Sequence, residues 1–259
     1  MATPKTIDLN CDLGESFGQY TIGRDEEMLP LISSVNIACG FHAGDANVMR
    51  HTVQQAQSHS LAIGAHPGFQ DLQGFGRRDM KLAIEDIYSL VVYQIGALQA
   101  FCQVEGAQLS HVKPHGALYN MAAKDMGIAD AIARAVHDVD PAILLFGRSR
   151  SALIDAGQRQ RLHTVEEAFI DRTYQKDGSL TPRQHTNAVH LTVEGAVAQA
   201  LDLIQNQTVT TVDGAIIHVP CQTLCLHGDH QQSVELAKAL REAMAQQGLS
   251  VASTKRRIG

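Results

Sequence analysis

Short apolar runs alternate with longer amphipathic segments along the whole chain. The apolar runs have the length and composition of buried strands, and the amphipathic segments repeat at helical spacing. We predict strands at 6–13, 35–39, 61–65, 109–113, 142–146, 164–169 and 223–227. Helices are predicted at 26–32, 47–58, 83–105, 124–139, 149–157, 193–205 and 233–247. The third helix is the clearest, with a buried stripe predicted at Ile84, Ile87, Val91, Ile95, Leu98 and Cys102.

This alternation is typical of βα units around a parallel sheet. Seven such units fit a closed barrel better than an open sheet, so we predict an α/β fold with one domain over residues 1–259, a seven-stranded (β/α) barrel. The longest irregular segments, 69–79 and 171–187, are predicted to be binding loops. A short hairpin is predicted at 208–212 and 215–219.

Composition and charge exclude several classes of protein. Lys+Arg 21 against Asp+Glu 27 gives a net charge of −6, so neither a nucleic-acid nor a membrane-surface partner is expected. The chain enters a predicted strand at once without a leader pattern, and no segment is expected to reach the length of a membrane span. The five cysteines are an odd number, which favours reduced thiols in a cytoplasmic protein.

Polar residues of one parity gather at the carboxyl ends of the predicted strands. Successive strand side chains point to opposite faces, and barrel active sites lie at the carboxyl ends of the strands. Asp45 also follows a glycine-flanked loop and is well placed to cap the next helix. The strand-end polar residues are Asp8, Asn10, Asp12 and Glu15, Asn36, His42 and Asp45, His66, His111, Lys113 and His115, Glu167, Asp171 and Arg172, and His227 and Asp229.

This set indicates an active site, because a structural barrel would bury aliphatic residues there. The alternative is a network of satisfied ion pairs that fills the barrel mouth. Carboxylates, imidazoles and cations together suit hydrolysis at a carbonyl of a small anion. Asp12, His42 and His66 are the candidate ligands for a divalent metal, although no short ligand motif supports one.

Other motifs carry less weight. The spacing from Cys221 through Cys225 to His227 resembles half a zinc site, but no second pair completes it, so we interpret it as strand core plus a site histidine. The sequence contains no phosphate loop, no dinucleotide fingerprint and no GxSxG nucleophile elbow. It therefore gives no sign of nucleotide binding by this chain alone.

Seven runs, in order along nearly the whole chain, resemble the LamB/YcsF family, the A subunits of bacterial 5-oxoprolinase. They are 8–15 (DLNCDLGE), 36–45 (NIACGFHAGD), 65–68 (AHPG), 74–78 (GFGRR), 112–120 (VKPHGALYN), 171–174 (DRTY) and 227–229 (HGD). Ala168 and Ile170 depart from the family pattern, but both are apolar and leave Asp171 and Arg172 in place.

The resemblance implies a barrel similar to the glycoside hydrolase/deacetylase superfamily. It also implies the ATP-dependent opening of 5-oxo-L-proline to L-glutamate, together with B and C subunits. ATP would be a cosubstrate that activates the lactam on those partners, and ring opening would be completed in this subunit. The sequence leaves open a bound divalent metal and a homo-oligomer.

Side-chain chemistry suggests individual roles. Asp12 or Glu15 would be the base for water, oriented by His42 or His66. Lys113 and His115 would stabilise the developing oxyanion or phosphate, and Lys113→Ala is expected to abolish turnover while leaving the fold intact. The predicted substrate-binding set is Arg77, Arg78 and Arg172, which would hold the substrate carboxylate, and Asp45, Asp171, His227 and Asp229, which have no individual role.

Two rival hypotheses remain at this point. One is a stand-alone metal-dependent deacetylase or amidohydrolase that acts on carbohydrate, which rests on fold analogy alone. The other is a non-catalytic scaffold subunit that positions its partners.

Overall fold

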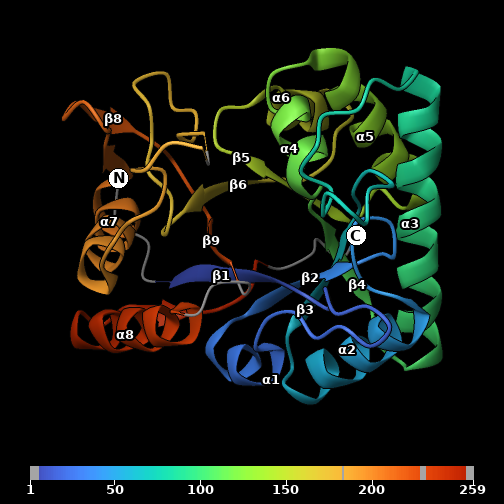
Figure 1. The fold of residues 1–259 in the computed structure, drawn as a ribbon, viewed down its shortest axis with the longest axis horizontal. Coiled ribbons are helices and arrows are strands. Elements are labelled where there is room, and N and C mark those ends of the chain that lie inside the picture. Colours follow the sequence, from blue (N-terminus) through green and yellow to red (C-terminus); the bar gives the residue numbers. More distant parts are fainter. Residues whose placement is uncertain (1–5, 183, 228–231, 255–259) are drawn as a thin grey trace.

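The computed structural model describes residues 6–182, 184–227 and 232–254. Seven parallel strands close into a barrel in the order β1-β2-β3-β4-β5-β6-β9, with β9 paired to β1 (Figure 1). The predicted fold, one seven-stranded (β/α) barrel, is confirmed. Its strands are β1 (Thr6–Leu13), β2 (Ser34–Ala38), β3 (Ala62–His66), β4 (Leu109–Val112), β5 (Leu144–Arg148), β6 (Thr164–Phe169) and β9 (Thr223–His227).

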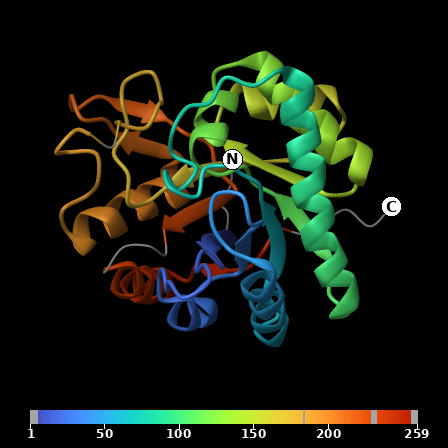
Figure 2. The same ribbon diagram turned by 45° about the vertical axis from the view of Figure 1, so that its right-hand side comes forward.

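The helices form a layer outside this ring of strands (Figures 1 and 2). They are α1 (Asp25–Met28) with a 3-10 turn (Leu29–Leu31), α2 (Ala46–Ser58), α3 (Ile84–Val104), α4 (Gly116–Ala122), α5 (Met126–Val139), α6 (Ala152–Arg159), α7 (Val193–Asn206) and α8 (Ser233–Gln246). Side chains cap three of them, because Asp45, Asp125 and Thr192 accept hydrogen bonds from backbone N–H groups in the first turns of α2, α5 and α7.

The structure also contains elements that the hydrophobic pattern did not predict. The segment that follows β4 turns at once into α4, which the sequence analysis did not assign as a helix. Two residues, Ser250–Val251, form β10 and pair with the start of β1. The predicted hairpin is present as β7 (Thr208–Thr210) and β8 (Ile216–His218), which pair antiparallel.

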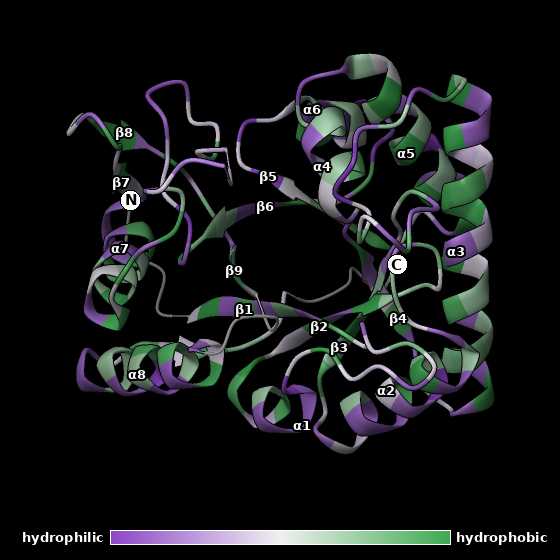
Figure 3. Ribbon diagram, in the orientation of Figure 1, coloured by the Kyte–Doolittle hydropathy of each residue, from purple (hydrophilic) through white to green (hydrophobic). Residues whose placement is uncertain are grey.

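Helix α3 corrects two expectations. Its stripe is buried as predicted except at Ile84, which is 41% exposed. By length and composition alone, the 21-residue helix α3 is long and apolar enough to cross a membrane, so the expectation that no segment approaches that length is wrong. Its buried face packs against α5 and α2, and hydrophobic and hydrophilic residues alternate along it (Figures 2 and 3). It is therefore an outer-layer helix of the barrel.

A hydrogen-bonded polar network fills the barrel interior. Asn10 Nδ2 donates to Glu167 Oε1 at 2.9 Å, and Asn36 Nδ2 donates to Asp12 Oδ1 at 2.8 Å. His111 Nε2 contacts Asn36 Oδ1 at 2.8 Å, and the His111 ring stacks on Phe146. Because these groups are buried, each needs its partners, and the network fixes the side chains below the rim.

Gly64 makes room for this network, and its substitution should be destabilising. A Cβ at Gly64 would collide with the His111 imidazole, whose ring also stacks on Phe146. We expect Gly64→Ala to lower the free energy of unfolding by about 1–3 kcal/mol through overpacking. Gly96 is the matched control: it lies in α3 with nothing within 4 Å of an added Cβ, so Gly96→Ala should stabilise slightly. Urea denaturation midpoints measure both; equal midpoints would contradict the packing argument.

His111 should make stability depend on pH. Burial, followed by the charges of Lys113 and His66, lowers the pKa of His111 to about 3. In the unfolded state His111 binds a proton near pH ~6.5, whereas in the folded state it stays neutral there. The free energy of unfolding therefore decreases as pH falls below about 6.5. The expected slope from this group is about 1.4 kcal/mol per pH unit between roughly pH 6 and pH 4. Denaturation of His111→Gln across this range should show a smaller slope than wild type, whereas exposed His59→Gln should not change it.

Candidate active site

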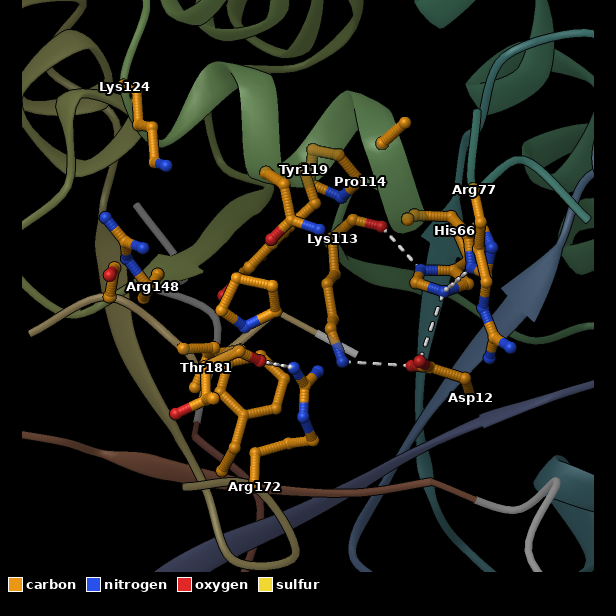
Figure 4. A pocket seen from close by; sticks show the side chains of 18 of the residues that line it. Asp12, His66, Arg77, Lys113, Pro114, Tyr119, Lys124, Arg148, Arg172 and Thr181 are labelled. Atoms are coloured by element: carbon orange, nitrogen blue, oxygen red, sulfur yellow. Dashed lines mark hydrogen bonds and ion pairs between the residues drawn. The ribbon is translucent and has the colours of Figure 1, made fainter. Parts of the chain in front are cut away.

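One cavity of about 480 Å³ opens at the carboxyl rim of the barrel. Figure 4 shows its side chains, which come from the ends of β1, β3, β4, β5 and β6, from α4 and from the loop after β6. The residues that line it are Asp12, Glu15, His66, Arg77, Lys113, Pro114, His115, Gly116, Ala117, Tyr119, Asn120, Lys124, Arg148, Phe169, Arg172, Ser179, Leu180, Thr181, Pro182 and Gln184.

Lys113 is the buried cation at the base of this cavity. Its Nζ lies 2.9 Å from both Asp12 Oδ1 and Glu167 Oε1, and 3.1 Å from Asn10 Oδ1. Burial alone would lower the pKa of Lys113, but the charges of Asp12 and Glu167 outweigh it and hold the pKa well above its usual value. Lys113 is therefore charged and neutralises two interior carboxylates. This environment revises the expectation that Lys113→Ala leaves the fold intact.

Three imidazoles and a carboxylate form a second cluster beside Lys113. His115 Nδ1 lies 3.0 Å from His66 Nε2, and Glu15 Oε1 lies 3.4 Å from His42 Nε2 and 3.7 Å from His115 Nδ1. The His42 and His115 rings stack with centroids 3.7 Å apart. Burial lowers the pKa of both His42 and His115 well below the usual value, so both imidazoles are neutral near pH ~7.

The hydrogen bonds of this cluster fix which nitrogens carry protons. His66 Nδ1 lies 2.7 Å from Lys113 O, and His115 Nε2 lies 2.8 Å from Phe75 O. A carbonyl oxygen only accepts, so both of these nitrogens donate. The remaining ring nitrogens, His66 Nε2 and His115 Nδ1, then face each other at 3.0 Å, and Asp12 Oδ2 lies 3.3 Å from His66 Nε2. Such a contact is favourable only with a proton or a cation between the rings.

This donor set fits a divalent ion. The ligand atoms of Glu15, His42, His66 and His115 all lie within 4.8 Å of one another, and neutral imidazole is the form that binds metals. Asp12, His42 and His66 were the predicted ligands, and two of them lie in this cluster. Asp12 lies beside it: its Oδ2 is 3.3 Å from His66 Nε2, while Lys113 and Asn36 both donate to its Oδ1.

Glycines let the loop after β3 pack closely on these rings. A Cβ at Gly76 would lie 2.7 Å from His42 Cβ and 2.8 Å from His115 Cδ2, and a Cβ at Gly68 would lie 2.7 Å from His42 Nδ1. Gly76 also has a φ of +62°, which favours glycine. The GFGRR run is therefore the loop that covers the imidazole cluster.

Only some of the predicted substrate-binding residues line the cavity. Arg77 and Arg172 line the cavity, and the Arg172 guanidinium also donates to Thr181 O and Ala188 O. Arg78 pairs with Asp71 and does not line the cavity. Asp45 caps α2 and accepts a hydrogen bond from Gly18 N at 2.9 Å. Its carboxylate oxygens therefore bind backbone N–H groups of this chain instead of a substrate.

The remaining residues of the predicted substrate-binding set are Asp171, His227 and Asp229. Asp171 lines a second cavity of about 270 Å³, between α7 and the start of α8. His227 ends β9 in register with Asp12, which places its backbone at the same rim. Asp229 lies outside the described residues.

The family model for the LamB/YcsF family matches residues 7–259. This chain belongs to the LamB/YcsF family. It is 57% identical over 247 residues to a protein from Geobacillus thermodenitrificans (strain NG80-2) that is named as the A subunit of 5-oxoprolinase, covering 95% of this chain and 96% of that one. It is also 54% identical over 245 residues to the protein of the same name from Shouchella clausii (strain KSM-K16), covering 95% and 97%.

Solved structures agree with this assignment. The lactam utilization protein from Thermus thermophilus superimposes with a TM-score of 0.92 at 43% identity, covering 96% of this chain and 100% of that one. The catalytic domain of a peptidoglycan N-acetylglucosamine deacetylase from Eubacterium rectale ATCC 33656 superimposes with a TM-score of 0.51 at 11% identity, covering 98% and 93%. The second likeness shows a shared barrel fold only.

Several residues that line the cavity of this LamB/YcsF chain were not predicted as site residues, among them Tyr119, Arg148 and Lys124. Tyr119 Oη donates to Glu167 Oε2 at 2.6 Å from the first turn of α4. Arg148 ends β5, which runs two residues beyond its predicted end, so the strand-end argument would have found Arg148 with the correct boundary. Lys124 lies between α4 and α5, where no strand-end pattern marks it.

Proposed function

We propose that this chain is the ring-opening subunit of an ATP-dependent 5-oxoprolinase, which converts 5-oxo-L-proline to L-glutamate together with B and C subunits. The names of its relatives support the reaction, and the cavity supports its location. One observation carries the proposal: the buried carboxylates and imidazoles share a single cavity with Lys113 and Arg77. That combination suits attack of water on a carbonyl carbon in a small carboxylic acid.

Ring opening needs activation because a lactam amide is resonance-stabilised. In our scheme a partner transfers the γ-phosphoryl group of ATP to the amide oxygen, which gives ADP and an O-phosphorylated imidate. Water adds to the imidate carbon, and the C–N bond then breaks, with its electron pair and a proton going to nitrogen. The resulting acyl phosphate reacts with a second water and releases phosphate and glutamate. The sequence has no phosphate loop, so ATP is assigned to the partners.

Within this scheme Glu15 takes the proton from water. Its carboxylate lines the cavity beside two imidazoles, whereas Lys113 and Asn36 both donate to the Asp12 carboxylate. His66 positions the cluster through its bond to Lys113 O, and Arg77 holds the substrate carboxylate. The Lys113 ammonium pairs with the Asp12 carboxylate and holds it in place.

His42, His66 and His115 would hold a divalent ion, with Glu15 left to act as the base. Such an ion, when bound, polarises a carbonyl oxygen and lowers the pKa of a bound water. The proposal for Glu15 does not depend on it, since the carboxylate reaches the cavity either way.

A metal-dependent deacetylase is the second candidate, and the imidazole cluster is the observation in its favour. The cavity lining argues against a neutral carbohydrate, because it carries the cations Arg77, Lys124, Arg148 and Arg172 besides Lys113. We also place the chain in the cytoplasm, since all five cysteines are free and buried.

Turnover of 5-oxoproline by the chain alone, and mixed with B and C subunits, tests the proposed function. We expect glutamate and ADP only from the mixture. Turnover with ATP by the chain alone would refute the division of labour. Deacetylation of an N-acetylglucosamine oligomer by the chain alone would instead favour the second candidate.

A further inference from the structure

The cavity has two chemically different ends. At one end lie Asp12, His66 and Arg77, and at the other lie Lys124 and Arg148 (Figure 4). Its volume of about 480 Å³ falls within the ~300–1,000 Å³ of sites that hold drug-sized ligands, which is more than a five-membered lactam needs. The far end therefore has room for a further group of the substrate.

The two cations at the far end are Lys124 and Arg148. Among residues 6–182, 184–227 and 232–254, neither Lys124 nor Arg148 forms a salt bridge, and the buried Arg148 Nε has no hydrogen-bond partner. Asp12 lies toward the opposite end, beside His66 and Arg77 (Figure 4). Glu15 also lines the cavity, and its Oε1 lies 3.7 Å from His115 Nδ1. Two such cations facing one cavity favour an anionic ligand.

Asp177 is the carboxylate whose charge acts on these two cations, and it does not line the cavity. It accepts hydrogen bonds from Ser179 N at 2.9 Å and Ser179 Oγ at 2.6 Å. These two bonds lower the pKa of Asp177 more than the charges of Arg148 and Lys124 do. Asp177 therefore anchors its own loop, and the far end of the cavity keeps a positive excess.

We propose that Lys124 and Arg148 bind the phosphoryl group of a phosphorylated lactam, with the ring carbon at the carboxylate and imidazole end. This inference rests on the proposed function and adds that this chain itself recognises the phosphoryl group. A phosphate dianion matches a point-charge lysine next to an arginine fork. The cations also hold the phosphoryl group while the C–N bond breaks, which disfavours early loss of phosphate.

Calorimetric titration of the isolated chain with inorganic phosphate tests the subsite without any turnover. We expect Arg148→Gln and Lys124→Gln each to weaken phosphate binding about tenfold, the loss of one charged contact. Arg241→Gln and Lys238→Gln are the matched controls. Each removes one positive charge, as the cavity variants do, and both residues lie on α8, away from the cavity. The controls should change phosphate affinity less than about twofold.

Two further binding measurements test where the phosphate lies and which molecule supplies the phosphoryl group. 5-Oxoproline and phosphate should bind together, because they occupy opposite ends of one cavity; mutual exclusion would overturn the proposal. ATP is the second source of a phosphoryl group. Binding of ATP that Arg148→Gln weakens would assign the subsite to the phosphates of the nucleotide, whereas phosphate binding without ATP binding supports the phosphorylated lactam.

Failure of the subsite and failure of the proposed function are distinguishable. Phosphate binding that responds equally to the cavity variants and to their α8 controls contradicts the subsite, even if the assembled complex turns over 5-oxoproline. Phosphate binding that only Arg148→Gln and Lys124→Gln weaken supports the subsite, even if no partner yields turnover and the proposed function fails.

Discussion

Lys113→Ala is expected to lower the free energy of unfolding by about 3–5 kcal/mol, because it leaves two buried carboxylates without their cation. Lys113 Nζ lies 2.9 Å from oxygens of both Asp12 and Glu167, and both carboxylates are buried. Turnover of the assembled complex should also be lost, since Asp12 would bind a proton or move. Urea denaturation of the isolated variant and glutamate formation by the complex measure the two effects.

Two controls separate charge from packing. Lys113→Met combined with Glu167→Gln removes one charge of each sign and should recover part of the lost stability while turnover stays low. Arg134→Ala breaks an exposed pair with Glu85 and should hardly move the denaturation midpoint. A wild-type midpoint for Lys113→Ala would show that the interior carboxylates do not depend on this cation.

Metal binding should depend on His66 and His115. Protein purified without chelators is expected to carry about one divalent ion per chain, as a site with three imidazole ligands implies. His66→Asn or His115→Asn removes a ligand, and we expect its affinity for the ion to fall at least about 100-fold. Elemental analysis and titration with zinc measure stoichiometry and affinity independently of turnover.

His59→Asn and His137→Asn are suitable controls, because both histidines lie on the surface away from the cluster. The prediction fails if zinc-saturated wild type retains no ion after dialysis. In that case a shared proton would explain the 3.0 Å contact between His66 and His115.

Periodicity and strand parity were enough to predict the barrel and most of its rim. Strand side chains alternate, so Asp12, Lys113 and Glu167 had to share the interior once the seven strands closed. The same rule placed His66 and His115 at one end of the barrel. These inferences depend only on backbone geometry, which the sequence specifies strongly.

The remainder depended on contacts that no local pattern encodes. Arg78 looked like a site residue, but Asp71 pairs with it. Asp45 is different, because it caps α2, as its position before that helix predicted. The cluster of Glu15, His42, His66 and His115 was only partly predicted, because Glu15 and His115 join it through tertiary contacts, while Asp12 Oδ1 pairs with Lys113. Partner choice among several nearby charges is a tertiary property, and the sequence alone leaves it undetermined.

The central claim is that ring opening occurs in this cavity while ATP is cleaved elsewhere. Glu15→Gln tests it most directly, because it removes the proposed base and leaves a side chain of the same size. Rapid-quench measurement of ADP and glutamate from the complex assembled with this variant is the experiment. We predict that ADP still forms, in an amount about equal to the active sites or greater, while glutamate formation falls at least about 1,000-fold. Formation of both products at wild-type rates would contradict the account.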